Sequence, residues 1–299
     1  MDMLHISGLH KRFGEKAVLN GLELSVPEHS IFGFIGKNGA GKTTTMKTVL
    51  GLLKADAGEI RVAGEKVVYG QTATNRYIGY LPDVPEFYSF MTADEYLSFC
   101  GEITGMNKKE IKSRSEELLR LVGLGDEKHR IKGFSRGMKQ RLGIAQALLN
   151  RPRLLICDEP TSALDPIGRK EILDILLAVR EQTTVLFSTH ILSDVERICT
   201  DVAFLDDGVV SIQGKLSDIK KKYRTEEYLL ELENENDLWM LLQAFDGLRQ
   251  TGRNQLHFRE GEHTMFDILR FMTERRILLL KMERIEPTLE TLFMEVVER

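Results

Sequence analysis

One short segment of the sequence has the residue types and spacing of a phosphate-binding loop. Gly36 to Thr43, "GKNGAGKT", fits the pattern G-x-x-x-x-G-K-[ST] between an expected strand and an expected helix. Glycines let backbone N–H groups converge on a polyphosphate, and the helix N-terminus adds its positive end. We expect Lys42 to reach the β and γ phosphates and the Thr43 hydroxyl to ligate Mg²⁺. The expected nucleotide contacts are Gly36, Lys37, Asn38, Gly39, Ala40, Gly41, Lys42, Thr43 and Thr44.

An acidic pair follows an apolar run in "LLICDEP". Asp158 ends this expected strand, where its carboxylate can hold Mg²⁺ directly or through water. Glu159 is then placed to orient and deprotonate a water for attack on the γ phosphate. The alternative is an acidic pair that only caps the next turn. That alternative would be favoured for the pair alone, and the phosphate loop makes it the weaker one.

His190 follows another apolar run, in "VLFSTH". A single histidine at a strand end is usually structural or solvated. Here a third parallel strand would deliver its side chain to the same crevice at the carboxyl ends of the strands. The combined pattern therefore predicts that His190 contacts the γ phosphate.

The segment "FSRGMKQR", residues 134–141, places a serine and a glycine at the start of a basic helix. Taken alone, it fits a nucleic-acid patch, a solvated helix face or part of an active site. The formal net charge is -4 and the isoelectric point about 6.0. No global field therefore draws the chain to nucleic acid, which weakens the first of these interpretations.

The elements that would position these residues indicate an α/β fold. Apolar runs at 30–36, 153–160 and 183–190 alternate with helical stretches, as in a parallel sheet flanked by helices. Residues 201–214 are typical of a hairpin that turns at Asp207-Gly208. From Met91 to Leu149 the pattern is mostly helical, and Thr92 with Glu95 has the form of a capping box.

Beyond Lys215 a charged linker precedes a tail in which strands and helices alternate. We predict a nucleotide-binding domain over residues 1–219, with a helical insert at about 87–150. Residues 220–299 are expected to form a small accessory α+β domain. The expected tail elements are strands at 228–232, 254–258 and 277–285 and helices at 236–245, 264–274 and 288–298.

Composition sets the remaining limits. The 299 residues are 42% hydrophobic and 29% charged, as in ordinary soluble globular proteins. No apolar run approaches the ~20 residues that span a bilayer, and the N-terminus does not resemble a secretory signal. Cys100, Cys157 and Cys199 form no CxxC, which favours free thiols in a reducing cytoplasm. Any membrane role would therefore need a separate protein.

The ordered set of motifs resembles the nucleotide-binding subunits of ABC transporters over nearly all of residues 4–215. The motifs are, in order, "GKNGAGKTT", "FSRGMKQR", "LLICDEP", "SALD" and "STH". The resemblance implies a P-loop NTPase core of the ABC ATPase type that hydrolyses ATP with Mg²⁺. It also implies that two chains hold two nucleotides between them. Ser135 and Gly137 would then contact the γ phosphate of ATP on the partner chain. Asp165 would link the two sites, Phe13 would stack on adenine and Val18 would add an apolar contact.

Two departures from the family pattern stand out. Where that pattern has two glycines and a glutamine, Arg136 and Met138 flank Gly137. In "GYLPDVPEF", Asp83 stands at the place of a glutamine that contacts Mg²⁺ and water. An aspartate can still serve the metal, but an ionised carboxylate cannot donate a hydrogen bond.

The resemblance also names partners. The helical insert is similar to the family region that receives a short helix from a membrane permease, although it is also an ordinary packed subdomain. The end of the tail, "PTLETLFMEVVER", is similar to the ends of subunits from drug, peptide and lipid exporters. We therefore expect the cytoplasmic ATPase subunit of an exporter. It would sit on the inner face of the cell membrane through a separate permease, with a second copy or a paralogue.

Two other classes stay open: a soluble ABC ATPase in translation or DNA maintenance, and a regulatory module that does not hydrolyse. The single phosphate loop and the absence of sustained heptads argue against the first, and Glu159 argues against the second. The sequence does not indicate the transported substrate.

Overall fold

The computed structural model describes residues 2–71, 73–222, 227–261, 263–285 and 288–292. The chain divides into two compact units, Met1–Leu216 and Ser217–Arg299. This division lies inside helix α7 (Leu216–Lys222), which also contains the boundary that we place after residue 219. No helix among these described residues is long and apolar enough to cross a membrane.

The first unit is built on a six-stranded sheet in the order β10-β9-β3-β8-β7-β6. Neighbouring strands from β9 to β6 run parallel, and β10 pairs with β9 as the expected hairpin. Strands β3, β7 and β8 are buried on both faces, which explains their unbroken apolar runs. The strands are β3 (Ile31–Gly36), β6 (Ile78–Leu81), β7 (Leu154–Asp158), β8 (Thr184–Thr189), β9 (Asp201–Asp206) and β10 (Val209–Lys215).

A second, antiparallel sheet in the order β2-β1-β4-β5 was not part of the sequence-based prediction. Its strands are β1 (Asp2–Phe13), β2 (Lys16–Pro27), β4 (Ala57–Val62) and β5 (Glu65–Lys66). Register shifts interrupt the pairing of β1 with β2, so the alternation of apolar and polar residues breaks along both strands. One hydrophobic core joins this sheet, helix α1 (Lys42–Val49) and the central sheet.

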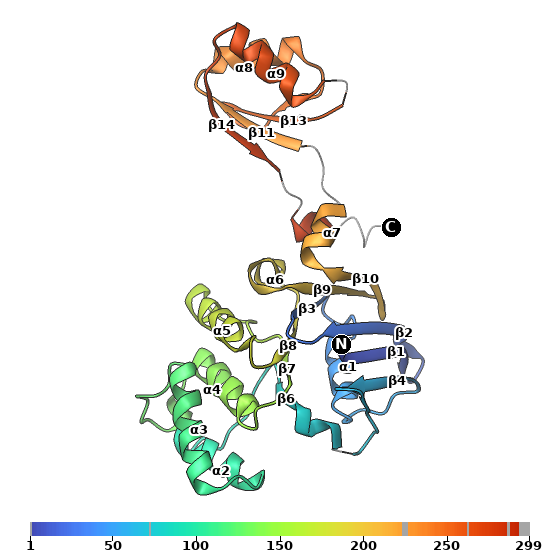
Figure 1. The fold of residues 1–299 in the computed structure, drawn as a ribbon, viewed down its shortest axis with the longest axis vertical. Helices are drawn as coiled ribbons and strands as arrows, with labels where there is room; N and C mark the ends of the chain where they lie inside the picture. The colour runs from blue at the N-terminus through green and yellow to red at the C-terminus, as the bar shows by residue number, and fades with distance from the viewer. Residues whose placement is uncertain (1, 72, 223–226, 262, 286–287, 293–299) are drawn as a thin grey trace. The chain divides into compact units, whose positions relative to one another are not determined.

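The opposite face of the central sheet is covered by helices α5 (Pro166–Val179) and α6 (Leu192–Ile198) (Figure 1). Phe32 and Phe34 of β3 belong to the core on the α1 side. A Cβ on Gly33, between them, would lie 3.0 Å from Val195 of α6. The strand therefore needs a residue without a side chain where α6 approaches it.

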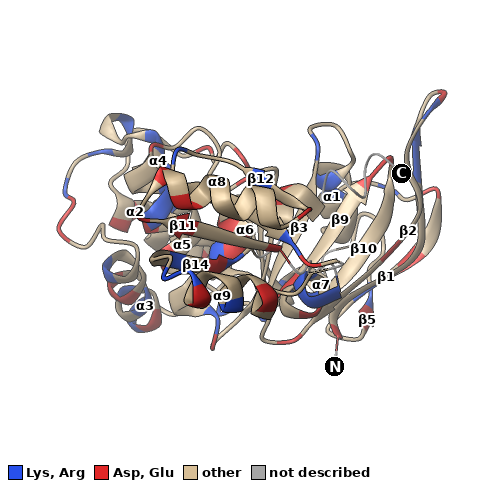
Figure 2. Ribbon diagram, turned by 90° about the horizontal axis from the view of Figure 1, so that it is seen from above, with Lys and Arg blue, Asp and Glu red and all other residues tan. Residues whose placement is uncertain are grey.

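The helical insert is formed by α2 (Ala93–Ile103), α3 (Lys108–Leu121), the short η2 (Ile131–Gly133) and α4 (Arg136–Leu148). The capping box at the start of α2 is present: the Thr92 side chain accepts a hydrogen bond from the Glu95 backbone, and the Glu95 carboxylate accepts one from the Thr92 backbone. Basic and acidic residues both occur along α3 (Figure 2). A 3-10 turn, η1 (Ala73–Tyr77), leads into β6.

The second unit has the element order β11-α8-β12-β13-α9-β14, and its antiparallel sheet has the order β12-β13-β11-β14. This is the ferredoxin-like arrangement. Leucines and phenylalanines of the sheet and helices form a core of their own. The elements are β11 (Glu227–Leu232), α8 (Glu235–Ala244), β12 (Leu248–Gln250), β13 (Gln255–Arg259), α9 (Met265–Glu274) and β14 (Leu279–Arg284).

The tail prediction missed the short strand β12, and most of its last expected helix lies outside the described residues.

Candidate functional site

The phosphate loop connects β3 to α1, and its backbone tolerates only glycine at two positions. Gly41 precedes α1 with a φ of 113°, and a Cβ there would lie 2.8 Å from Leu19. A Cβ on Gly36 would lie 2.7 Å from the carbonyl oxygen of Leu205. The sequence pattern therefore reflects a turn whose main chain is tightly enclosed.

Lys42 lies at the base of this loop and is 6% exposed. Its Nζ donates to the carbonyl oxygen of Gly36 at 2.6 Å and lies 3.1 Å from Oε1 of Glu159. The lysine charge is therefore neutralised by the carboxylate that we expect to act as general base. Two sequence-predicted residues thus form an ion pair across the pocket.

Asp158 accepts hydrogen bonds from two hydroxyl groups. Thr43 Oγ1 donates to Oδ2 at 2.7 Å, and Ser188 Oγ donates to Oδ1 at 2.6 Å. The Asp158 carboxylate is thereby fixed beside the first turn of α1, where Thr43 presents its hydroxyl. Carboxylate and hydroxyl oxygens are suitable ligands for Mg²⁺.

Glu159 has a φ of 48°, in the left-handed region that a residue with a side chain rarely adopts. Its backbone N–H donates to Ser188 Oγ at 3.0 Å, which supports this conformation. Its Oε2 lies 2.9 Å from Nδ1 of His190. The structure thus brings Glu159, Lys42 and His190 together, and the imidazole remains about half exposed.

A pocket of about 350 Å³ lies above these groups, within the size range of small-molecule sites. Among described residues, no three His, Cys, Asp or Glu side chains form a metal-binding group. A Mg²⁺ that also binds nucleotide phosphates needs only one or two carboxylates from the protein. The pocket is lined by Asn38, Gly39, Gly41, Lys42, Thr43, Thr44, Asp83, Asp158 and Glu159.

The signature segment, residues 134–141, does not line this pocket. Ser135 is exposed and caps α4 by accepting a hydrogen bond from the Met138 N–H at 3.2 Å. Nothing crowds Gly137, since a Cβ there would lie 3.9 Å from its nearest neighbour. Asp165 caps α5 in the same way, through the Gly168 N–H at 3.1 Å. These three residues lie at helix starts outside the pocket.

The two departures from the family pattern face each other. Nη2 of Arg136 lies 3.5 Å from Oδ1 of Asp83, and both side chains are about half exposed. Ser162 Oγ donates to the same oxygen at 2.9 Å, and Gln140 donates to the Asp83 carbonyl at 2.7 Å. An exposed pair of this length contributes only about 0–1 kcal/mol. Arg136, which stands where the family pattern has a glycine, is thus paired with the acidic side chain of Asp83.

Sequence reasoning missed a set of buried polar residues behind the site. Ser188 orients both Asp158 and Glu159. Asp194 is 2% exposed and accepts hydrogen bonds from Thr161 Oγ1 at 2.7 Å and Arg169 Nε at 2.8 Å. It thereby joins the chain after Glu159 to the helix after His190. A serine in a fully buried strand was the available signal for Ser188.

The two residues expected at the adenine lie apart from the pocket lining. Val18 is close to the phosphate loop, because a Cβ on Gly41 would lie 3.1 Å from its carbonyl oxygen. Phe13 ends β1, is 51% exposed, and has the Lys11 ammonium 5.3 Å from its ring centre. The ring is therefore accessible for stacking but is not in the pocket.

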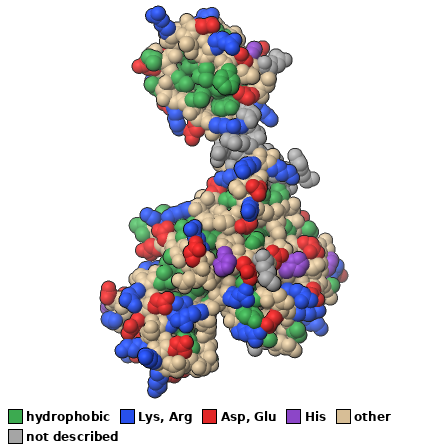
Figure 3. Space-filling view, viewed as in Figure 1, with side chains coloured by type: hydrophobic (Ala, Val, Ile, Leu, Met, Phe, Trp, Pro, Cys, Tyr) green, Lys and Arg blue, Asp and Glu red, His purple; other side chains and the backbone are tan. Residues whose placement is uncertain are grey.

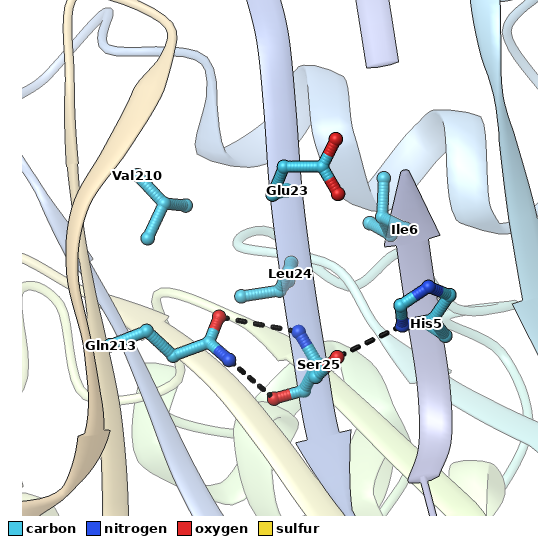
Figure 4. A pocket seen from close by; sticks show the side chains of 7 residues that line it. All are labelled: His5, Ile6, Glu23, Leu24, Ser25, Val210 and Gln213. Carbon is cyan, nitrogen blue, oxygen red and sulfur yellow. Dashed lines mark hydrogen bonds between the residues drawn. The ribbon is translucent and has the colours of Figure 1, made fainter. Parts of the chain in front are cut away.

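Another pocket, of about 280 Å³, separates β2 from β10 (Figure 4). Both ends of the Gln213 side-chain amide bond the backbone of Ser25 at 3.2 Å. The Ser25 hydroxyl in turn lies 2.9 Å from His5 Nδ1. These polar groups satisfy one another and join two strands that diverge, which is a structural role.

Arg141 of the signature segment also has a structural role. Its Nη1 donates to the carbonyl oxygen of Val122, beyond the end of α3, at 3.0 Å. This contact argues against a nucleic-acid patch.

Comparisons with known proteins agree with this geometry. Residues 19–162 match the family model described as ABC transporter, and residues 214–297 match the C-terminal domain of DrrA1-3-like ATP-binding proteins. The chain is 42% identical to the uncharacterized ABC transporter ATP-binding protein YxlF of Bacillus subtilis, over 80% of this chain and 79% of that protein. It is 36% identical to the bacitracin transport ATP-binding protein BcrA of Bacillus licheniformis, over 99% and 97%.

Solved structures extend the likeness to the fold. An ATP-binding subunit of an ABC transporter has a TM-score of 0.66 at 32% identity, covering 74% of this chain and 93% of that one. The cbiO1 protein of Clostridium perfringens, part of an ABC transporter complex, has a TM-score of 0.68 at 26% identity, covering 73% and 90%. Sequence motifs, site geometry and these likenesses together show that the chain belongs to the family of ABC transporter ATP-binding subunits.

Proposed function

We propose that this ATP-binding subunit hydrolyses ATP, with Glu159 as the general base and His190 as a γ-phosphate contact. The observation that carries the proposal is the position of Glu159, with Lys42 on one oxygen and His190 on the other. Lys42 and Glu159 line the pocket, and His190, which is not part of the pocket lining, reaches it through its contact with Glu159. A regulatory module without hydrolysis would not need this carboxylate.

Nucleotide binding changes the pairing of Lys42. Phosphate oxygens compete with Glu159 for its ammonium group, which also bonds the Gly36 carbonyl. Once Lys42 binds phosphate, the Glu159 carboxylate can accept a proton from water. His190 Nδ1 lies 2.9 Å from Oε2 of that carboxylate and would keep it oriented.

The metal-binding residues fit Mg²⁺. Thr43 and Asp158 already share a hydrogen bond of 2.7 Å, and Asp83 lines the same pocket. Thr43 and Asp158 would hold Mg²⁺, which would neutralise negative charge that develops on the phosphate groups. Ser188 keeps Asp158 in place, since it occupies the carboxylate oxygen that Thr43 does not.

The pocket leaves one side of the nucleotide to a second chain. Ser135 is exposed and Gly137 uncrowded, and both lie outside the pocket formed by their own phosphate loop. A helix start with an exposed serine can donate to phosphate oxygens. We infer that two chains, identical or paralogous, close on two ATP molecules, with Asp165 linking the sites.

We further propose that the subunit powers export through a separate permease, at the cytoplasmic face of the cell membrane. Aromatic side chains gather before and within α2, where Tyr88 and Phe99 pack edge to face at 5.5 Å. Tyr88 and Phe90 remain 51% and 61% exposed. Exposed aromatic residues beside α2 suit the short permease helix that this region receives in the family. Similarity to BcrA supports export.

Co-purification from membranes tests this function. A tagged chain should recover a protein with many membrane spans, and that protein should raise the ATPase rate. Tyr88→Ala combined with Phe90→Ala should lower the recovery while the isolated subunit keeps its ATP binding. Recovery with ribosomes or DNA instead would contradict the transport role and favour the soluble class of ABC ATPases.

A further inference from the structure

In the part of the C-terminal unit that the structure describes, the sheet ends with a strand that is paired on one side. Among the strands that the structure describes, β14 has β11 as its neighbour and forms the edge of the sheet. Three apolar side chains are exposed at this strand or next to it: Leu278 at 59%, Leu280 at 60% and Met282 at 47%. Hydrophobic side chains also gather on the face of this unit seen in Figure 3.

The register of β14 fixes which main-chain groups point away from β11. The Ile285 N–H donates to the Glu227 carbonyl at 2.8 Å. In an antiparallel pair, alternate residues bond to the same neighbour. Lys281 and Glu283 therefore bond toward β11, and Met282 between them directs its N–H and C=O to the outer edge.

The side chains around Met282 are self-complementary. If two copies of β14 run antiparallel about Met282, each Lys281 stands opposite Glu283 of the other copy. Because the Met282 pair exchanges two main-chain hydrogen bonds, these opposite charges occupy the adjacent non-hydrogen-bonded positions. Side chains approach most closely at such positions. Met282 faces the hydrophobic core side, opposite the fully buried Leu230.

The edge would be protected against other strands. A lysine on an edge strand normally discourages pairing, because its charge would meet a foreign strand without a partner. Here Glu283 already lies 2.5 Å from Lys281 within one strand, and twofold pairing supplies the same complement from the second copy. The charge pattern therefore selects a copy of the same strand.

We propose that the C-terminal units of two copies of this chain pair through β14, antiparallel and centred on Met282, so that their two sheets become one. The occupant of this edge is thus a second copy of the chain. This contact is separate from the signature segment and needs no nucleotide. It would hold two subunits together between rounds of ATP binding.

Cross-linking of the full-length, nucleotide-free chain tests the proposal. Met282→Cys should form a disulfide-linked dimer, because hydrogen-bonded pairs place Cα atoms about 5.5 Å apart, within disulfide range. Gln250→Cys, an exposed residue on the opposite edge strand β12, is the matched control and should not cross-link. Burial raises the pKa of all three natural thiols, Cys100, Cys157 and Cys199, which keeps the background of the unsubstituted chain low.

A charge exchange tests the register. In the Met282→Cys background, Lys281→Glu alone and Glu283→Lys alone should each lower cross-linking by about tenfold, because like charges then face each other. Mixing the two variants should restore it, since the chain with two acidic side chains at these positions would meet the chain with two basic ones. An intrachain role of the Lys281–Glu283 pair would not predict recovery on mixing.

Three results would overturn the proposal. The first is a cross-linking yield for Met282→Cys no higher than that for Gln250→Cys. The second is a cross-linking yield that the single charge reversals leave unchanged. The third is a mixture of the two charge variants that cross-links no better than either variant alone. Nucleotide-free protein is used throughout, so failure of the ATP-dependent sandwich would leave the outcome unchanged.

Discussion

At the scale of residues, Lys42 and Glu159 form an ion pair, with 3.1 Å between Nζ and Oε1. Both are largely buried, so each would be left with an unpaired charge if the other were removed. In the proposed mechanism, ATP would replace the carboxylate as the partner of Lys42. The same exchange would prepare the proposed base and bind the substrate.

Lys42→Ala should weaken ATP binding by about 10–100-fold, because each charge-assisted hydrogen bond is worth about 1.5–3 kcal/mol. Calorimetric titration with ATP measures the change. Lys47→Ala removes an exposed charge from the same helix and should bind as the unsubstituted chain does. Equal affinity of both variants would contradict the role of Lys42.

The sequence predicted those site residues that lie next to one another along the chain. The phosphate loop and Asp158-Glu159 are contiguous motifs, and their side chains meet in one pocket. Ser188 and Asp194 were missed because their function depends on contacts with Asp158 and Thr161, about 30 positions away. Such roles require the packing of β8 and α6, which a motif does not encode.

At the scale of elements, Asp194 couples the loop after β7 to the start of α6. Its carboxylate bonds Thr161 and Arg169, while Glu159 and His190 lie at the two ends of the segments that it joins. Among the described residues, Asp194 makes no hydrogen bond or ion pair with Glu159 or His190. We therefore infer that it is a positioning residue for Glu159, the proposed base, and for His190.

Asp194→Asn should lower kcat for ATP hydrolysis about tenfold and leave KM nearly unchanged, because the phosphate loop keeps its contacts. Steady-state phosphate release per folded protein measures both constants. Asp174→Asn is the control, since Asp174 bonds Arg197 across the same two helices at the surface. A loss of stability without any change in kcat would show a purely structural role.

The parallel core was predictable and the antiparallel sheet was not. Strands buried on both faces give continuous apolar runs, which mark β3, β7 and β8. Register shifts interrupt the pairing of β1 with β2, so the alternation of apolar and polar residues expected for a strand is not kept along either of them. In the C-terminal unit, helix spacing was clear enough to place α8 and α9, whereas the three-residue β12 is too short to show a pattern.

At the scale of the whole molecule, the subunit brings half of each ATP site to the proposed dimer. In this proposal the phosphate loop and Glu159, which line the pocket, form one half, and Ser135 and Gly137, at the start of α4, form the other. Mutation can test this division. Two chains with substitutions in opposite halves of the site can restore one intact site only if they form a mixed dimer.

A mixture of Lys42→Ala and Ser135→Arg chains should recover about a quarter of the wild-type ATPase rate, since half of the dimers hold one intact site of two. Each variant alone should be nearly inactive. A mixture of Lys42→Ala with Glu159→Gln should stay inactive, because both changes affect the same half. Recovery in this control mixture, or none in the first, would contradict the shared site.

The fate of bound ATP in the Glu159→Gln variant tests the central claim most directly. After incubation with ATP and Mg²⁺, this variant should retain intact ATP, while the wild-type chain releases phosphate about 10²–10⁴ times faster. Binding should be at least as tight as in the wild-type chain, because Lys42 and the loop are unchanged and the competing carboxylate charge is removed. Hydrolysis by Glu159→Gln at the wild-type rate would show that Glu159 is not the base.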